Sequence, residues 1–179
     1  MKKVLVTLIA LSLPTFALAD ATKGFYVQAD AGHATVKGDA SVKGFSPRIS
    51  AGYDFGDFRV AADYTHYKSK KINTSLVDKE AKYHSAGVSA IYDFDLQAPV
   101  KPYVGARVAV NHASTKVETA NSYYERKETK TGVGVMAGVS YEVTPNVALD
   151  AGYRYNYWGK FDETKIHTHE VSAGVRVTF

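Results

Sequence analysis

The chain has 179 residues, with 22 Lys and Arg against 18 Asp and Glu, and it contains no cysteine. This length indicates one domain, and the lack of cysteine excludes a fold held by disulfides. The near balance of charge argues against a partner made of nucleic acid. The composition is unusual in its 13 Tyr and 14 Gly. Both suit a β-barrel with aromatic belts at the membrane interfaces and a crowded interior.

The first residues have the pattern of a secretory signal peptide. Lys2 and Lys3 precede an apolar run over residues 4–13, and Ala17-Leu18-Ala19 fits a small-residue cleavage site. The apolar run is shorter than the roughly 20 residues that a membrane-spanning helix needs. We therefore expect residues 1–19 to be removed and residues 20–179 to form one barrel domain.

The rest of the chain predicts eight β-strands, because apolar residues alternate with polar or small ones in each segment. In the last segment Val171, Val175 and Phe179 fall on one face, and Glu170 and Arg176 fall on the other. The predicted strands are residues 25–33, 47–55, 58–67, 83–94, 102–114, 132–143, 147–158 and 169–179.

Short and long connections alternate between these strands. Tight turns are expected at Gly56-Asp57 and Thr144-Pro145-Asn146, and a short connection at residues 95–100. Longer polar segments, among them residues 68–82, 115–130 and 159–166, join the other strands. This layout predicts an all-β fold, an eight-stranded antiparallel transmembrane β-barrel with short periplasmic turns and four longer extracellular loops. A soluble β-sandwich is the alternative, but it gives no reason for such regular alternation.

The two faces of the predicted strands differ in charge. The face assigned to lipid has no charged residue across its central stretch, where Arg or Lys would cost about 2–4 kcal/mol. The other face carries five arginines and five carboxylates, and an eight-stranded barrel is just wide enough for side chains to fill it. We therefore expect an ion-pair network in the lumen. Its predicted members are Asp30, Arg48, Arg59, Asp63, Arg107, Glu142, Asp150, Arg154, Glu170 and Arg176.

Five histidines are expected at the loop ends of their strands, on the lipid-facing side: His33, His66, His84, His112 and His169. One interpretation is that they extend the aromatic girdle where lipid meets headgroup. The other is that His66, His84 and His112, on three consecutive strands, form a metal or phosphate patch.

We expect no cofactor and no catalytic site. His84 and Ser85 are neighbours on a strand, so they point to opposite faces and cannot form a nucleophile–base pair.

Several long stretches resemble the neisserial surface protein and opacity (Opa) family of outer-membrane proteins. They include G-F-Y-V-Q-A-D at 24–30, T-P-N-V-A-L-D-A-G-Y-R-Y-N-Y-W-G-K at 144–160 and S-A-G-V-R-V-T-F at 172–179. The resemblance implies a surface-exposed barrel in the outer membrane of a Gram-negative bacterium, and we expect it to be a monomer. Its implied partners are outer-membrane lipid, lipopolysaccharide, host-surface proteins and the barrel-assembly machinery, which would recognise Phe179 as an assembly signal.

Two loop segments carry candidate ligand-binding residues: Lys68, Lys70, Lys71 and Lys79 in one, and Tyr123 and Tyr124 in the other. A basic segment suits sulfated glycans or lipopolysaccharide phosphates, although a solvated loop has the same composition. Two functions stay open at this point. One is a closed barrel that displays loops for adhesion or for binding host factors, and the other is a structural or small-pore barrel with no loop ligand.

Overall fold

The computed structural model describes residues 23–37, 41–67, 72–74, 77–119, 122–161 and 164–179; the predicted signal peptide lies outside them. Within these ranges, no helix has the length and apolarity to cross a membrane. The regular structure described is nine β-strands: β1 (Gly24–Lys37), β2 (Ser41–Asp54), β3 (Phe58–Tyr67), β4 (Ile72–Thr74), β5 (Val77–Asp93), β6 (Val100–Thr119), β7 (Ser122–Thr144), β8 (Val147–Phe161) and β9 (Thr164–Thr178).

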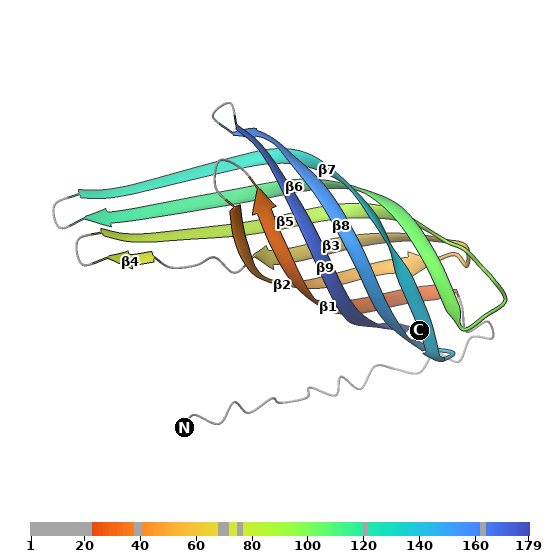
Figure 1. Ribbon diagram of the computed structural model, residues 1–179. Coiled ribbons are helices and arrows are strands. Elements are labelled where there is room, and N and C mark those ends of the chain that lie inside the picture. The colour runs from red at the N-terminus through yellow and green to blue at the C-terminus, as the bar shows by residue number, and fades with distance from the viewer. Residues whose placement is uncertain (1–22, 38–40, 68–71, 75–76, 120–121, 162–163) are drawn as a thin grey trace, which may run out of the picture.

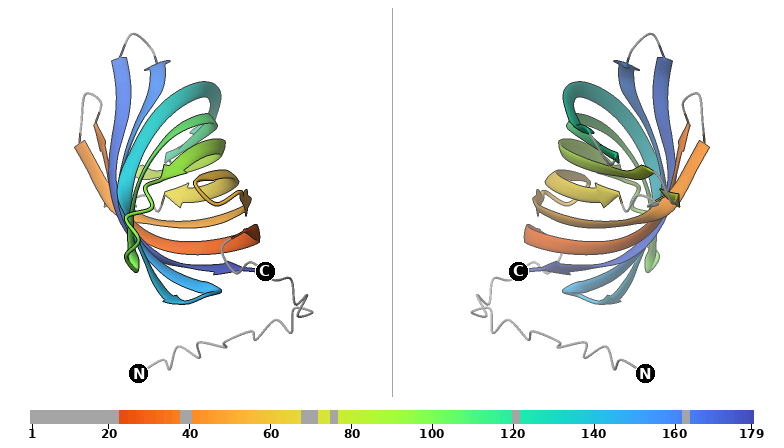
Figure 2. Two further views of the ribbon diagram at one scale, coloured as in Figure 1. Left: turned by 90° about the vertical axis from the view of Figure 1, so that its right-hand side faces the viewer. Right: turned by 90° about the vertical axis from the view of Figure 1, so that its left-hand side faces the viewer.

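Eight of these strands close into a barrel, as the sequence predicts (Figure 1). Each pairs antiparallel with its neighbours in the chain, β3 pairs with β5, and β9 pairs back onto β1. Seen from its two ends, the sheet curves around a common axis (Figure 2). A closed sheet satisfies its backbone hydrogen bonds internally, which is the condition for crossing a lipid bilayer with strands. The short β4 lies outside the ring and pairs with β5 alone.

The two ends of the barrel differ. At one end, the turn end, short connections over residues 55–57, 94–99 and 145–146 join neighbouring strands. At the other end β5, β6 and β7 continue well beyond the remaining strands (Figure 1). We call this part the projecting sheet: residues 72–74, 77–83, 113–119 and 122–128. Its seven residues on β6 span about 23 Å at about 3.3 Å per residue.

The strand ends correct the sequence interpretation. The segments 68–82, 115–130 and 159–166 were predicted to be loops. The first contains β4 and the start of β5, the second the end of β6 and the start of β7, and the third the end of β8 and the start of β9. Pairing between β6 and β7 runs without a break from Val100↔Tyr141 to Thr119↔Ser122. In this barrel the apolar alternation serves contact with lipid, so it ends where the strands leave the apolar band, although their hydrogen bonding continues.

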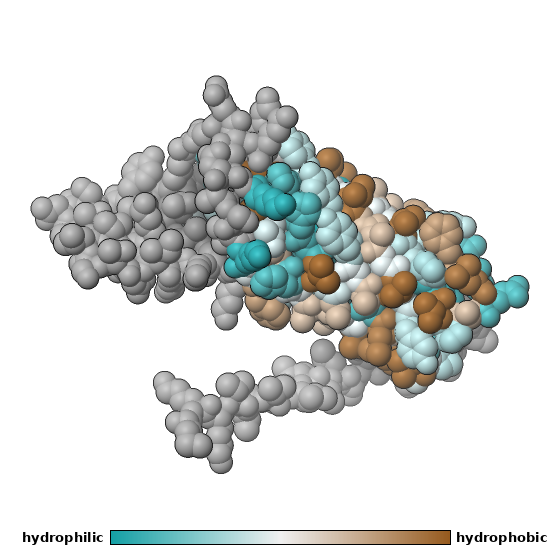
Figure 3. Space-filling model, in the orientation of Figure 1, coloured by the Kyte–Doolittle hydropathy of each residue, from teal (hydrophilic) through white to brown (hydrophobic). Residues whose placement is uncertain are grey.

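Side chains alternate between the lumen and the outer wall as predicted. On β1, Tyr26 is 2% exposed while its neighbour Phe25 is 70% exposed. The exposed side chains of the wall are mainly Val, Ala, Phe and Tyr, and apolar residues spread over its surface (Figure 3). Charged side chains are thus buried in the lumen and apolar side chains are exposed on the wall. This distribution is the reverse of that in a water-soluble protein, and it fits contact with lipid.

Candidate functional site

The centre of the lumen is built around Asp63 of β3. Arg107 of β6 donates to both of its carboxylate oxygens, from Nε at 2.9 Å and from Nη2 at 2.6 Å. Arg154 of β8 adds an ion pair at 3.6 Å across the barrel. Arg107 also donates to Ser85. One carboxylate therefore ties together three strands that are far apart in the sequence.

A second group connects β1, β2 and β9. Arg48 donates from Nε to Asp30 at 3.1 Å, from Nη1 to Glu170, and from Nη2 to Ser172 at 3.1 Å. Glu170 is fully buried. Because β1 and β9 are the first and last strands, this group joins the two strands that close the barrel.

A third group lies toward the turn end, and sequence reasoning missed part of it. Arg59 forms a two-bond pair with Asp93, at 2.6 and 2.7 Å. Arg176 lies 3.8 Å from both Asp54 and Asp150. Asp54 and Asp93 were absent from the predicted network, although strand parity places both on the inward face. They are the last residues of β2 and β5, where no further strand residues follow to confirm which face they occupy.

One predicted member of the network lies elsewhere. Glu142 is partly exposed near the turn end, and there it pairs with Lys101 at 2.7 Å. The described lumen therefore buries five arginines and six carboxylates, and every one of these arginines lies within 4 Å of a carboxylate: Asp30, Arg48, Asp54, Arg59, Asp63, Asp93, Arg107, Asp150, Arg154, Glu170 and Arg176.

Little free volume is left among these side chains. A lumen cavity between Arg48, Asp63 and Tyr103 has a volume of about 30 Å³, which leaves room for no more than a few water molecules. Glycines make room for the large groups: a Cβ on Gly87 would lie 2.7 Å from Arg107 Cζ, and one on Gly152 would lie 2.4 Å from Tyr103 Oη. The small inward residues are thus part of the filling of the lumen.

An aromatic cluster covers the lumen at the end opposite the turns. Trp158 is 1% exposed, and its ring meets Tyr67 at 5.3 Å and Tyr83 at 6.2 Å between centroids. Ala34 and Ile166 complete the cluster. The sequence alone did not reveal this cluster, because its members come from strands that are distant in the chain.

The histidines lie on the outer wall at the same end. His66, His84 and His112 are direct cross-strand neighbours. The Nδ1 atoms of His66 and His84 are 3.1 Å apart, and Tyr64 Oη lies 2.7 Å from that of His84. Among the described residues, no three or more His, Cys, Asp or Glu side chains are arranged to hold a metal ion. The metal hypothesis therefore stays a prediction, now for a pair of histidines.

A second histidine cluster lies on β8 and β9. The Tyr155 ring packs against His167 and His169, with centroids 5.9 and 5.2 Å apart. Tyr153 hydrogen-bonds to His169 through its hydroxyl. His167 was not among the predicted histidines, although it has the same parity as His169.

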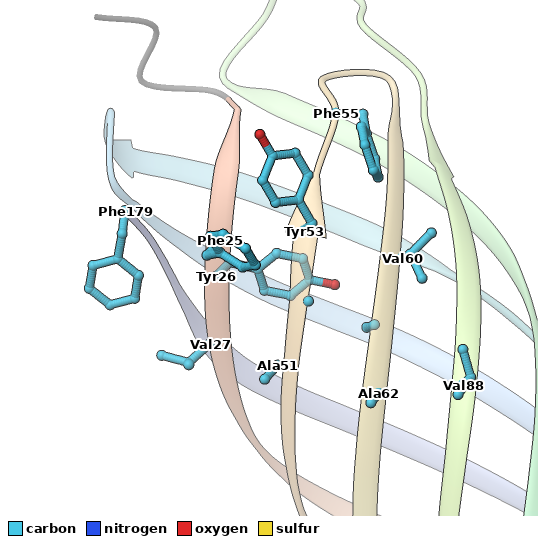
Figure 4. A pocket seen from close by; sticks show the side chains of 12 residues that line it. Phe25, Tyr26, Val27, Ala51, Tyr53, Phe55, Val60, Ala62, Val88 and Phe179 are labelled. Atoms are coloured by element: carbon cyan, nitrogen blue, oxygen red, sulfur yellow. The ribbon is translucent and has the colours of Figure 1, made fainter. Parts of the chain in front are cut away.

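Phe179 ends the chain on the outer wall at the turn end. Its backbone N–H donates to Phe25 O at 2.8 Å, which extends the β1–β9 pairing to the last residue. Its side chain lies beside a shallow apolar groove of about 620 Å³ (Figure 4). Small side chains, Ala51 and Ala62, form the floor of this groove, and Tyr53 and Phe55 stand at one end of it.

The structure describes three of the six predicted ligand-binding residues, by their backbone. Lys68, Lys70 and Lys71 lie outside the described residues. Lys79 belongs to β5, and Tyr123 and Tyr124 belong to β7, but only their backbone is described.

A closed eight-stranded barrel with an apolar wall and a charged, filled lumen defines the class of outer-membrane β-barrel proteins. Solved structures agree with this. The crystal structure of neisserial surface protein A (NspA) is 56% identical to this chain, with a TM-score of 0.75, and the match covers 87% of this chain and 97% of NspA. Ail of Yersinia pestis, solved with the heparin analogue sucrose octasulfate, shares the fold at 21% identity, with a TM-score of 0.62 over 86% of this chain and 98% of Ail.

The family follows from the sequence matches. Residues 51–179 match the model of the opacity family porin proteins. Opacity protein opA58 of Neisseria gonorrhoeae is 36% identical over 74% of this chain and 71% of its own length, and opA67 is 36% identical over 74% and 77%. The chain belongs to the opacity family, which confirms the predicted resemblance. It is therefore an outer-membrane surface protein of a non-enzymatic family, with the turn end in the periplasm and the projecting sheet outside the cell.

Proposed function

We propose that this protein is a monomeric binding protein of the cell surface, in which the barrel is an anchor and the projecting sheet presents the ligand-binding segments. One observation carries the proposal: β5, β6 and β7 continue as a paired sheet about 23 Å beyond the barrel rim. A barrel that served only as a structural element of the membrane would not need this extension. Its length supports contact with a partner outside the lipopolysaccharide headgroups.

The ligand class that we propose is a sulfated glycan on the host surface. Residues 68–82 contain five lysines against Asp78 and Glu80, a sequence net charge of +3. Clustered lysines attract polyanions, and this attraction weakens as salt is added. A sulfated ligand is held by Ail, which shares the fold. For this chain the proposal rests on the lysines themselves.

The test is a variant in which Lys68, Lys70, Lys71 and Lys79 are changed to Gln, compared with wild type for attachment to host cells and to immobilised heparin. We expect both to fall strongly, and the wild-type binding to weaken with rising salt. The matched control changes Lys23 and Lys101, near the periplasmic turns, to Gln. Unchanged heparin binding by the four-lysine variant, with the barrel correctly folded, would contradict the glycan proposal.

The second candidate function is a small-pore barrel, which the family description as porin favours. The 30 Å³ cavity and the aromatic cluster over the lumen support a closed barrel instead. In planar bilayers we expect no steady conductance from wild type, and none from a protein with exchanged extracellular segments. Steady conductance that is independent of these segments would favour the pore.

Phe179 is proposed as the signal that the barrel-assembly machinery reads. Deletion of Phe179 removes one backbone hydrogen bond, to Phe25, from a sheet that is otherwise intact. We therefore expect a large fall in surface level in cells but little change in the stability of the barrel refolded in vitro. Normal surface levels of the truncated protein would contradict this role.

A further inference from the structure

The outer wall of β1, β2, β8 and β9 carries a set of basic and aromatic side chains at its extracellular end. Cross-strand pairing arranges them in two rows: Lys43, Thr35, His169 and Tyr155 form the lower row, and Lys37, His167 and Tyr157 form the upper row. We call this set the basic rim patch. Figure 3 shows hydrophilic side chains gathered at this end of the wall, with apolar ones toward the turn end.

The patch lies at the height of the lipid headgroups. Below it, the row Phe45, His33, Val171 and Tyr153 is aromatic and apolar, and the next row contains Ala31, Ala173 and Ala151. Lys37 is twelve residues beyond Phe25 on β1, which is about 28 Å of height for a strand tilted about 45°. The apolar band of such barrels is about 25 Å tall. Lys37 and His167 therefore lie just above the acyl chains.

The charge of the patch has no acidic counterpart on the described part of this wall. Among the described outward-facing residues of β1, β2, β8 and β9 there is no Asp or Glu. Lys37 and Lys43 are both exposed. In the lumen, by contrast, every buried arginine faces a carboxylate. A cationic surface at this height is complementary to an anionic headgroup of the outer leaflet.

We propose that the basic rim patch binds a phosphate group of lipid A, the phosphorylated glycolipid anchor of lipopolysaccharide. Lysine ammonium groups supply the charge, and imidazole and phenol groups supply hydrogen bonds to phosphate oxygens. The acyl chains of the same molecule would lie along the Ala31, Ala151 and Ala173 wall, where small side chains leave the sheet surface flat. The site would thus contact both the headgroup and the acyl chains of one lipid molecule through the same set of strands.

The experiment uses the mature protein in phospholipid nanodiscs that contain lipid A with both phosphates, lipid A without phosphates, or phosphatidylglycerol. Native mass spectrometry counts the lipid molecules that stay bound after release from the disc. We expect selective retention of phosphorylated lipid A. The double change Lys37→Gln and Lys43→Gln should weaken this retention about 30-fold. Each lysine near an anionic lipid surface contributes about 1 kcal/mol of attraction, and the loss of about 2 kcal/mol corresponds to this factor.

The matched control changes His66→Gln and His84→Gln, which are cross-strand neighbours on β3 and β5, outside the basic rim patch. It removes two imidazoles from the outer wall and leaves every lysine in place, so it should retain lipid A as wild type does. Circular dichroism and the mobility of unheated protein on gels verify that each variant is folded. Equal retention of lipid A without phosphates would overturn the proposal, as would equal retention of phosphatidylglycerol or full retention by the double-lysine variant.

Discussion

Basic side chains occur in two regions of this barrel, and the protein treats them differently. In the lumen, Arg48, Arg59 and Arg107 each donate hydrogen bonds to a carboxylate. On the outer rim, Lys37 and Lys43 have no acidic residue beside them among the described residues of their wall. The lumen charges are neutralised by the chain itself, so they serve the fold. The rim charges are left for a partner in the membrane.

The comparison predicts its largest effect in the lumen. Asp63→Leu leaves Arg107 and Arg154 buried beside each other without their shared carboxylate. Removal of one partner from a buried ion pair costs about 3–5 kcal/mol, and we expect a loss of this size in the free energy of unfolding. Urea titration of the protein folded into vesicles measures it. The neighbouring outward change Ala62→Leu is the control and should be nearly neutral; an equal loss in both variants would contradict the difference between the faces.

A second prediction moves a positive charge along the outer wall. Ala173→Lys places an ammonium group in the apolar band, at a cost of about 2–4 kcal/mol, whereas Thr35→Lys places it in the basic rim patch, at about 0–1 kcal/mol. The same vesicle titration compares both variants with wild type. Equal destabilisation at the two positions would show that the patch is not at headgroup height.

A third prediction concerns the filling of the lumen. A Cβ at Gly152 would lie 2.4 Å from Tyr103 Oη, so Gly152→Ala forces the ring to move, at a cost of about 1–3 kcal/mol. The double variant with Tyr103→Phe removes the oxygen that clashes and should recover part of this loss in the titration. Full stability of the single variant would mean that the lumen is more loosely packed than the structure shows.

The smallest effect is expected at the histidine pair. His66 and His84 have Nδ1 atoms 3.1 Å apart, close to the separation of about 3.3 Å between two nitrogens bound to one tetrahedral zinc at about 2.05 Å. We expect zinc at micromolar concentration to shift the imidazole NMR signals of these two residues. His33 is the internal control, because its cross-strand neighbours are Phe45 and Val171, neither of which can bind a metal ion. Unchanged signals for His66 and His84 would exclude the metal hypothesis.

Strand parity was enough to predict most of this molecule. The eight barrel strands, the two faces and the inward position of nine of the ten proposed lumen charges follow from alternation with period two. Which arginine meets which carboxylate does not follow, because Arg107 and Asp63 are 44 positions apart and their contact depends on register and barrel diameter. Glu142 shows the limit of parity: it has the inward parity but lies near a rim, where Lys101 pairs with it in contact with solvent.

The sequence was least informative above the membrane. There the strands need no apolar face, so residues 115–130 were predicted as a loop although they are paired strand. The histidines were placed at the correct height, but the register that puts His66, His84 and His112 in one row came only from the structure. The same register assembles the basic rim patch from strands at both ends of the chain.

The unequal height of the strands has one more consequence. The partner of β7 on one side, β8, pairs with it only from Val133 toward the turn end, so in the described pairings residues 122–132 of β7 bond to β6 alone. Such an uncovered row of backbone N–H and C=O groups is a template onto which another molecule of the same protein could add as a further strand. The sequence there, S-Y-Y-E-R-K-E-T-K-T-G, is rich in both signs of charge. This composition opposes fusion of neighbouring barrels into extended sheets on a crowded cell surface.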